Sequence, residues 1–253
     1  MLHFDDIVFG PVHSRRLGTS LGLNILPSKG KTCNFDCVYC ECGWNRDGAV
    51  PGRRFPAVDE VEKSMQTAFS ALASEGTSVD SITMSGNGEP TLNPDFPQIV
   101  DSVLKLRDKF FPNAKVSVLS NATMTYRPDV VEALKKVDNP ILKLDAATDE
   151  LVKLIDRPSG SYSVAGIIEN LKAFEGNFIL QTMFLDSPDF VTWSEEALGR
   201  WYHLIRELKP REIMVYTIDR ETPDKRLKKC SVDQMTKFVA PLVEEGFKVQ
   251  VRG

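Results

Sequence analysis

The chain has 253 residues, of which 42% are hydrophobic and 26% charged, and its formal net charge is −4. This length supports one sizeable core without disulfide staples, and the composition is typical of a globular protein. The acidic balance argues against a strongly basic nucleic-acid binder. It leaves room for a local basic patch, so a folded RNA stays among the candidate substrates.

Apolar and β-branched runs alternate with helical patterns along the chain. We expect strands at 20–26, 79–84, 115–119, 141–144, 178–184 and 212–218, and a final short strand at 247–251. Apolar residues at helical spacing predict helices at 58–74, 97–109, 128–137, 149–155, 164–174, 194–208 and 232–245. This order predicts right-handed βαβ crossovers and a parallel sheet.

The number of strand–helix units limits the architecture, because six units are too few for a closed barrel of eight. We therefore expect an α/β fold, a partial (β/α)6 barrel of mostly parallel strands that is open on one side. A single domain would cover 1–253, with an N-terminal extension at 1–19, the partial barrel at about 20–220, and a C-terminal helix and strand at about 221–253. Functional residues gather at the C-terminal strand ends of such folds.

No targeting or membrane-spanning pattern is evident in the sequence. No apolar run approaches the roughly 20 residues that cross a bilayer. The first ten residues carry Asp5 and Asp6 and lack the basic-then-apolar order of a signal peptide. We therefore expect no membrane partner and a cytoplasmic location, where clustered cysteines indicate metal binding or catalysis rather than disulfides.

Three cysteines, Cys33, Cys37 and Cys40, form a C-x3-C-x2-C spacing directly after the first expected strand. Thiolates are soft ligands that suit zinc or an iron–sulfur cluster. Three thiolates on one loop can each bind a different iron of a cubane and leave the fourth iron open to a substrate. The alternatives are unligated thiols or a structural zinc site, which usually takes four ligands from two half-sites. Cys42 is either a bystander or a fourth ligand, and Cys230 fits a packing residue.

The cysteine loop, with the aromatic Tyr39 just before its last cysteine, resembles the signature of the radical S-adenosylmethionine (SAM) superfamily. The segments 9–18 and 23–27, taken with this loop, resemble the wyosine-synthetase-like radical SAM subgroup. The resemblance extends to about the sixth strand. It implies a [4Fe–4S] cluster on Cys33, Cys37 and Cys40, SAM as the second cofactor, and an electron donor such as flavodoxin or ferredoxin.

Polar residues follow each of the first six expected strands. The resemblance implies that most of these residues contact SAM. Taken alone, they also fit tight turns, helix caps and exposed salt bridges. The glycine–glutamate motif that grips the SAM amino group corresponds to Gly86, Asn87, Gly88, Glu89 and Pro90. The other residues that the resemblance places near SAM are Tyr39, Ser120, Asn121, Asp145, Arg157, Thr182, Met183 and Tyr216.

The substrate is the open part of the sequence-based prediction. Arg15 and Arg16 before the first strand, and Asp219 and Arg220 after the sixth, are the candidate substrate residues. The resemblance implies that a 5′-deoxyadenosyl radical abstracts hydrogen from a substrate, with a tRNA nucleoside as one candidate. A glycyl-radical-enzyme activase acting on a protein and an enzyme acting on a small molecule or peptide are the alternatives. A non-catalytic iron–sulfur electron carrier is the alternative from another class.

Overall fold

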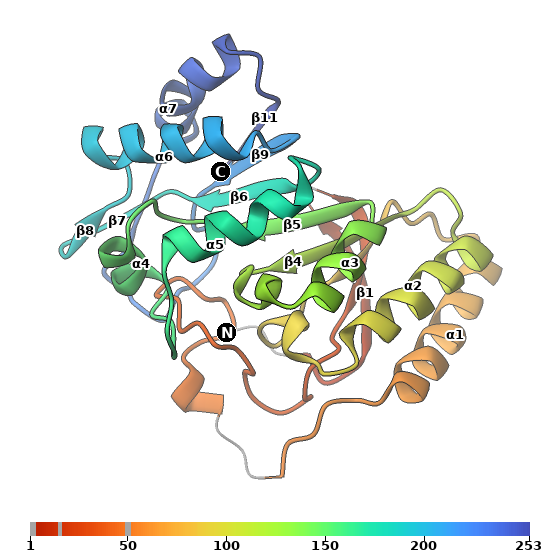
Figure 1. Ribbon diagram of the computed structural model, residues 1–253. Coiled ribbons are helices and arrows are strands. Elements are labelled where there is room, and N and C mark those ends of the chain that lie inside the picture. Colours follow the sequence, from red (N-terminus) through yellow and green to blue (C-terminus); the bar gives the residue numbers. More distant parts are fainter. Residues whose placement is uncertain (1–3, 15–16, 49–51) are drawn as a thin grey trace.

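A computed structural model describes residues 4–14, 17–48 and 52–253, and its central element is an eight-stranded sheet of order β1-β2-β3-β4-β5-β6-β9-β11. The pair β1–β2 is antiparallel and all other neighbouring pairs are parallel. The strands are Val8–Ser14 (β1), Gly18–Leu23 (β2), Ser81–Met84 (β3), Lys115–Ser120 (β4), Asn139–Lys143 (β5), Ile179–Met183 (β6), Glu212–Tyr216 (β9) and Val249–Arg252 (β11). The curled sheet in Figure 1 confirms the partial parallel barrel.

The helices lie along the outer face of this sheet, with α1 beside α2, α3 next, and then α5 and α6 (Figure 1). Their bounds are Val58–Ser74 (α1), Phe96–Phe110 (α2), Pro128–Lys136 (α3), Asp149–Ile155 (α4), Val164–Leu171 (α5), Glu195–Leu208 (α6) and Val232–Glu244 (α7). Each of the seven helices begins and ends within three residues of the bounds expected from the sequence. In the described part of the chain, no helix combines the length and apolarity needed to cross a bilayer.

Hydroxyl side chains set the starts of the later helices. Thr148, Ser163, Ser194 and Ser231 are the N-caps of α4 to α7, and each accepts a backbone N–H of the first turn. Helix α5 ends three residues before its expected end, because Lys172–Phe174 tightens into a 3-10 turn (η4). Three further 3-10 turns lie in loops: η1 at Asn45–Gly48, η2 at Pro90–Leu92 and η3 at Thr123–Tyr126.

Two small strand arrangements were not expected from the sequence. Strand β1 pairs with β2 through a register shift between Phe9 and Val12, within a stretch that contains Gly10 and Pro11. Glycine and proline weaken the strand pattern and are tolerated at an edge, where β1 lies. A separate three-stranded sheet joins Leu185–Ser187 (β7), Phe190–Val191 (β8) and Lys228–Lys229 (β10). These strands are too short to show a period in the sequence.

The sheet separates a large outer core from a small inner one. The inner cluster consists of Ile141, Ile179 and Met214, with Leu17 and Leu119 packed against them. Side chains on a strand repeat their direction every second residue. The residues two positions further along β5, β6 and β9 therefore face the space above this apolar cluster, at the C-terminal strand ends.

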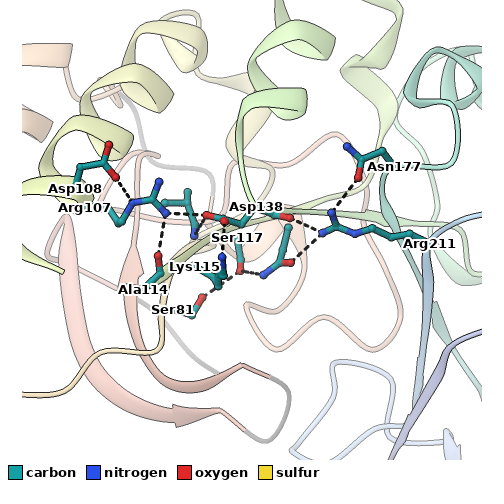
Figure 2. A network of polar contacts seen from close by, with 11 residues as sticks. Ser81, Arg107, Asp108, Ala114, Lys115, Ser117, Asp138, Asn177 and Arg211 are labelled. Carbon is teal, nitrogen blue, oxygen red and sulfur yellow. Dashed lines mark hydrogen bonds and ion pairs between the residues drawn. The ribbon is translucent and has the colours of Figure 1, made fainter. Parts of the chain in front are cut away.

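A polar network ties the opposite, N-terminal ends of the strands together (Figure 2). The Asp138 carboxylate accepts hydrogen bonds from Arg107 Nη1 at 2.8 Å, Lys115 Nζ at 3.0 Å and the backbone N–H of Val116 at 3.0 Å. Arg211 donates to Asn177 Oδ1 at 3.0 Å and to the backbone oxygen of Asp138. Ion pairs and hydrogen bonds thus hold the N-terminal ends of the strands together.

Candidate functional site

A cavity of about 480 Å³ opens at the C-terminal ends of the strands. Its walls come from the cysteine loop, the loops after β3 and β4, the ends of β5, β6 and β9, and the N-terminal hairpin. The expected site residues that line it are Cys33, Cys37, Tyr39, Cys40, Gly86, Gly88, Glu89, Ser120, Asn121, Met183, Tyr216, Asp219 and Arg220. Segments far apart in the sequence thus meet at one site.

The cysteine loop is fixed by backbone hydrogen bonds to the end of α4. Asp36 N donates to the oxygen of Asp156 at 2.9 Å, and Val38 N donates to the oxygen of Ile155 at 2.9 Å. Cys37 is buried, whereas Cys33 and Cys40 are partly exposed toward the cavity. These bonds fix the position of the cysteine loop beside the cavity.

The environment of the thiols differs from one cysteine to the next. Burial raises the pKa of Cys33 to about 12 and moves the pKa of Cys37 well above its usual range. The hydrogen bond between Cys42 and Cys40 lowers the pKa of Cys40 to about 6, and Lys31 acts in the same direction. Buried thiols become ligands only when a metal stabilises the thiolate.

The donor set fits a cluster held by three cysteines. The sulfurs share one cavity, and soft thiolates are the ligands of iron–sulfur clusters. In a cubane, each cysteine would hold a separate iron atom.

The glycine–glutamate loop after β3 lies directly against the cysteine loop. Gly88 forms a parallel bridge with Thr32, and a Cβ at Gly88 would lie 1.9 Å from the Thr32 oxygen. Only glycine allows this approach. Gly86 lines the cavity nearby, and Cys42 Sγ donates to its carbonyl oxygen at 3.4 Å.

Glu89 is buried, and its carboxylate accepts four hydrogen bonds. It accepts from Thr91 N at 3.1 Å, Thr91 Oγ1 at 2.5 Å, Ser120 Oγ at 2.9 Å and Asn121 N at 2.7 Å. Burial raises the pKa of Glu89 despite these donors. Asn121 continues the network, because its Nδ2 donates to Asn34 Oδ1 at 2.8 Å on the cysteine loop.

Asn87 and Pro90 do not line the cavity, although the same motif contains them. The Asn87 side chain donates to the backbone oxygens of Phe4 at 2.8 Å and Pro27 at 3.2 Å, so it joins the N-terminal segment to the loop after β2. Pro90 begins the η2 turn and is buried. The structure thus gives both residues a supporting position.

A buried polar cluster joins Cys37 to strand β5. The Tyr39 hydroxyl donates to the Asp145 carboxylate and lies 3.2 Å from Asp156 Oδ1, and Cys37 Sγ donates to the same Asp156 oxygen at 3.1 Å. Asp145 Oδ1 also accepts from the backbone N–H of Met183 at 2.8 Å. Burial, followed by the charge of Asp145, raises the pKa of Asp156 well above its usual range. Asp145 thus supports the cavity wall from behind rather than lining it.

Lys143 lines the cavity and was not among the expected site residues. Its Nζ donates to the hydroxyls of Tyr39 at 2.5 Å and Tyr216 at 3.2 Å, and it lies 3.7 Å from Asp145 Oδ2. Burial works against the charge of Lys143, but Asp145 and the other nearby acids leave its pKa well above the usual value. The cavity wall therefore carries a largely buried cation at the end of β5.

Gln181, Lys31, Phe4 and Phe9 are further lining residues that sequence reasoning missed. Gln181 Nε2 is buried and has no hydrogen-bond partner among the described residues. Phe4 and Phe9 stack with their ring centroids 3.8 Å apart. For Gln181 the available signal was its position two residues before Met183, on the same face of β6.

Some expected residues lie elsewhere. The exposed Arg157 stacks on the Trp44 ring at 4.8 Å and lies outside the cavity lining. Thr182 is also outside the lining; its Oγ1 donates to the oxygen of Leu144 at 2.8 Å and accepts from Trp201 Nε1 at 3.1 Å.

Arg220, at the cavity rim, pairs with Glu41 of the cysteine loop at 2.5 Å. Asp219 also lines the cavity and lies 3.7 Å from Lys229 Nζ. Arg15 and Arg16 lie outside the described residues.

A family model described as the radical SAM superfamily matches residues 28–186. The relatives of this chain include UPF0026 proteins. The one from Methanocaldococcus jannaschii is 31% identical over 92% of this chain and 70% of its own length. The one from Helicobacter pylori is 32% identical over 91% of this chain and 72% of its own length.

Several solved structures share the fold at low sequence identity. Streptococcus suis SuiB bound to the precursor peptide SuiA has a TM-score of 0.67 at 17% identity, covering 92% of this chain and 48% of SuiB. The structure anSMEcpe with bound AdoMet has a TM-score of 0.57 at 19% identity, covering 92% of this chain and 64% of the other. Archaeal TYW1 has a TM-score of 0.53 at 14% identity, covering 90% of this chain and 72% of the other. The chain spans about half the length of SuiB.

Proposed function

Because the chain belongs to the radical SAM superfamily, we propose that its cavity is where SAM is cleaved, with Cys33, Cys37 and Cys40 as the cluster ligands. The superfamily uses a [4Fe–4S] cluster and SAM, so the chain is a radical SAM enzyme. When bound, these two cofactors supply a 5′-deoxyadenosyl radical that abstracts hydrogen from a substrate. One observation carries the proposed site: the three thiols and the glycine–glutamate loop line one cavity, and the backbone bridge between Thr32 and Gly88 joins the cysteine loop to the glycine–glutamate loop.

The chain's own residues bind and orient SAM in this proposal. Glu89 accepts from the SAM amino group, since a carboxylate accepts hydrogen bonds from an ammonium. Two of the groups that donate to Glu89 in this structure are the hydroxyls of Thr91 and Ser120, which can rotate and so leave room for the ammonium. Asn121 lies between Glu89 and the cysteine loop, where it orients the methionyl portion. For Arg157 to pair with the SAM carboxylate, its guanidinium would have to leave the Trp44 ring.

The remaining polar groups position the nucleoside portion and exclude water. Tyr39, Asp145 and Lys143 form one hydrogen-bonded unit that also holds the Met183 backbone N–H. This unit fixes the end of β6, where Met183 faces the cavity. The ion pair between Arg220 and Glu41 lies at the cavity rim, where it would help to keep solvent away from a radical.

A peptide or protein side chain is the substrate class that we favour. Two of the structural neighbours are described with peptides, SuiB with SuiA and anSMEcpe with Cp18Cys, and they support this choice. The net charge of −4 speaks against tRNA, the substrate class suggested by the subgroup resemblance. A flavodoxin or ferredoxin would supply the electron.

The test is anaerobic reconstitution followed by addition of dithionite and SAM and an assay for 5′-deoxyadenosine. We expect the product from the wild-type protein, loss to background in Cys37→Ala, and retention in Cys230→Ala, which removes a buried thiol outside the cavity lining. Zinc without iron or sulfide in the purified protein would overturn the proposal. If a full cluster gives no product, the cluster spectrum with added SAM decides. An unchanged spectrum would indicate an electron carrier.

A further inference from the structure

Lys31 is a buried cation in the wall of the cavity that holds the three cysteines. Its side chain is 2% exposed, whereas that of its ion-pair partner Asp36 is 29% exposed. Lys31 Nζ lies 3.5 Å from Asp36 Oδ1 and donates to the Gly43 carbonyl oxygen at 3.1 Å. The thiols of Cys33, Cys37 and Cys40 line the same cavity, and Lys31 helps to lower the pKa of Cys40.

The position of Lys31 is set by the backbone as well as by its charge. Arg53 Nη1 donates to the Lys31 carbonyl oxygen at 2.7 Å. The next residue, Thr32, donates its N–H to the Asn87 oxygen at 2.7 Å and forms the bridge to Gly88. The backbone is therefore held by Arg53 and the Thr32 contacts, and the ammonium is held by the Gly43 oxygen in the wall of the cavity that the three cysteines also line.

The ion-pair partner Asp36 offsets only part of the positive electrostatic potential that Lys31 creates in the cavity. Asp36 also accepts from Asn45 N at 2.7 Å and is reached by water, which screens its charge. Lys31 is shielded from water, so its charge acts on the cavity through a low effective dielectric. The charge of Lys31 therefore acts on the cavity more strongly than that of Asp36, whereas Glu89 beside Cys33 and Asp156 beside Cys37 act in the opposite sense.

We propose that Lys31 raises the reduction potential of the cluster held by Cys33, Cys37 and Cys40. The inference rests on the proposed cluster site. One electron from the donor, dithionite in vitro, enters the cluster; no bond forms or breaks, and the cluster gains one negative charge. A buried positive charge beside the ligands stabilises the reduced state more than the oxidised one, because net charge and hydrogen bonds near the sulfurs set the potential.

The test is a potentiometric titration of the reconstituted protein, followed by the electron paramagnetic resonance signal of the reduced cluster. In Lys31→Met we expect at least a tenfold fall in the equilibrium constant for reduction, which is a fall of about 59 mV for a one-electron couple. Lys31→Arg should keep a potential close to that of the wild type. Lys153→Met, which removes an exposed lysine from α4, should leave the potential unchanged.

The variant Asp36→Asn should shift the reduction potential in the direction opposite to that expected for Lys31→Met. The asparagine oxygen can still accept from Asn45 N, so the loop keeps its hydrogen bond while the counter-charge is lost. We expect this variant to raise the potential. A general loosening of the loop would shift both variants in the same direction, and that result would overturn the role of Lys31.

The remaining outcomes are also decisive. If Lys31→Met and the wild type hold equal amounts of iron and sulfide and have equal potentials, the inference is wrong and the proposed function stands. If Lys31→Met holds no cluster, the shift in Asp36→Asn decides, and an unchanged or lowered potential refutes the inference. A wild-type protein that binds no cluster would overturn the proposed function together with this inference.

Discussion

Replacing Gly88 by alanine should separate the two loops that form the cofactor site. A Cβ at this position would lie 1.9 Å from the Thr32 oxygen and 2.4 Å from the Thr32 carbonyl carbon, both backbone atoms. An ordinary contact begins at 3.4 Å, so the loops would have to move apart by about 1.5 Å. Neither partner is a flexible side chain that could turn away.

The cost follows from what this movement breaks. Thr32 N donates to the Asn87 oxygen at 2.7 Å and Glu89 N donates to the Thr32 oxygen at 3.0 Å, and both bonds cross the interface between the loops. Each lost bond costs about 1 kcal/mol. Alanine at the positive φ of Gly88 adds roughly 1–2 kcal/mol of strain. We therefore expect the free energy of unfolding to fall by about 3–4 kcal/mol.

SAM cleavage should fall by about 100-fold or more, because a displacement of about 1 Å in a catalytic site costs on this order. Gly76→Ala is the matched control, since Gly76 also has a positive φ of 71° but no atom within 4 Å of its Cβ position. That variant should lose only about 1–2 kcal/mol from strain and keep its cleavage rate. Urea unfolding of the cluster-free proteins gives the stabilities, and 5′-deoxyadenosine per cluster gives the rates. If the two variants match in both measurements, the reasoning is refuted.

Three further predictions concern the supporting structure. Burial raises the pKa of Asp138, but hydrogen bonds from Val116, Arg107 and Lys115 outweigh burial and leave the pKa below its usual value. This stabilisation is complete above the unfolded pKa of about 3.9 and is lost as pH falls through the folded pKa. Asp138→Asn should therefore lower the free energy of unfolding at pH 7 by about 1–3 kcal/mol, and the difference from the wild type should vanish in acid; urea titrations at several pH values measure it. Trp201→Phe removes the buried donor to Thr182 Oγ1 and should cost about 1–2 kcal/mol in the same assay. Phe69→Ala, at a fully buried position of α1, should cost about 3–5 kcal/mol, and a loss below about 1 kcal/mol would contradict its place in the outer core.

The fold could be predicted because its signals are local. Apolar spacing gave α1 at Val58–Ser74 and α4 at Asp149–Ile155 with the observed bounds. The six barrel strands stood out because strands buried on both faces carry apolar or β-branched runs. Strand β1 was missed because its fit to the edge depends on pairing with β2, and Gly10 and Pro11 hide the pattern.

Residues that line the candidate site could be predicted where a motif of ligand-capable residues directly follows an expected strand. The cysteine spacing and the Gly88–Glu89 pair each follow a strand, so the parallel sheet brings them to the same edge. The expectation for Arg157 rests on the local sequence motif alone. Its positive φ of 47° and its contact with Trp44 depend on how two loops meet, which no local pattern encodes.

Lys143 and Gln181 show why the rest of the site stayed hidden. Both lie inside strands, where a polar residue in an apolar run looks like a weak point in the pattern. They are direct neighbours across β5 and β6, and both point into the space above the inner apolar cluster. A buried lysine needs partners, and the partners of Lys143 come from the cysteine loop 104 residues earlier and from β9 73 residues later. Such long-range pairing is set by the register of the sheet, so the chemistry of the cavity wall could be derived only after the strands had been placed.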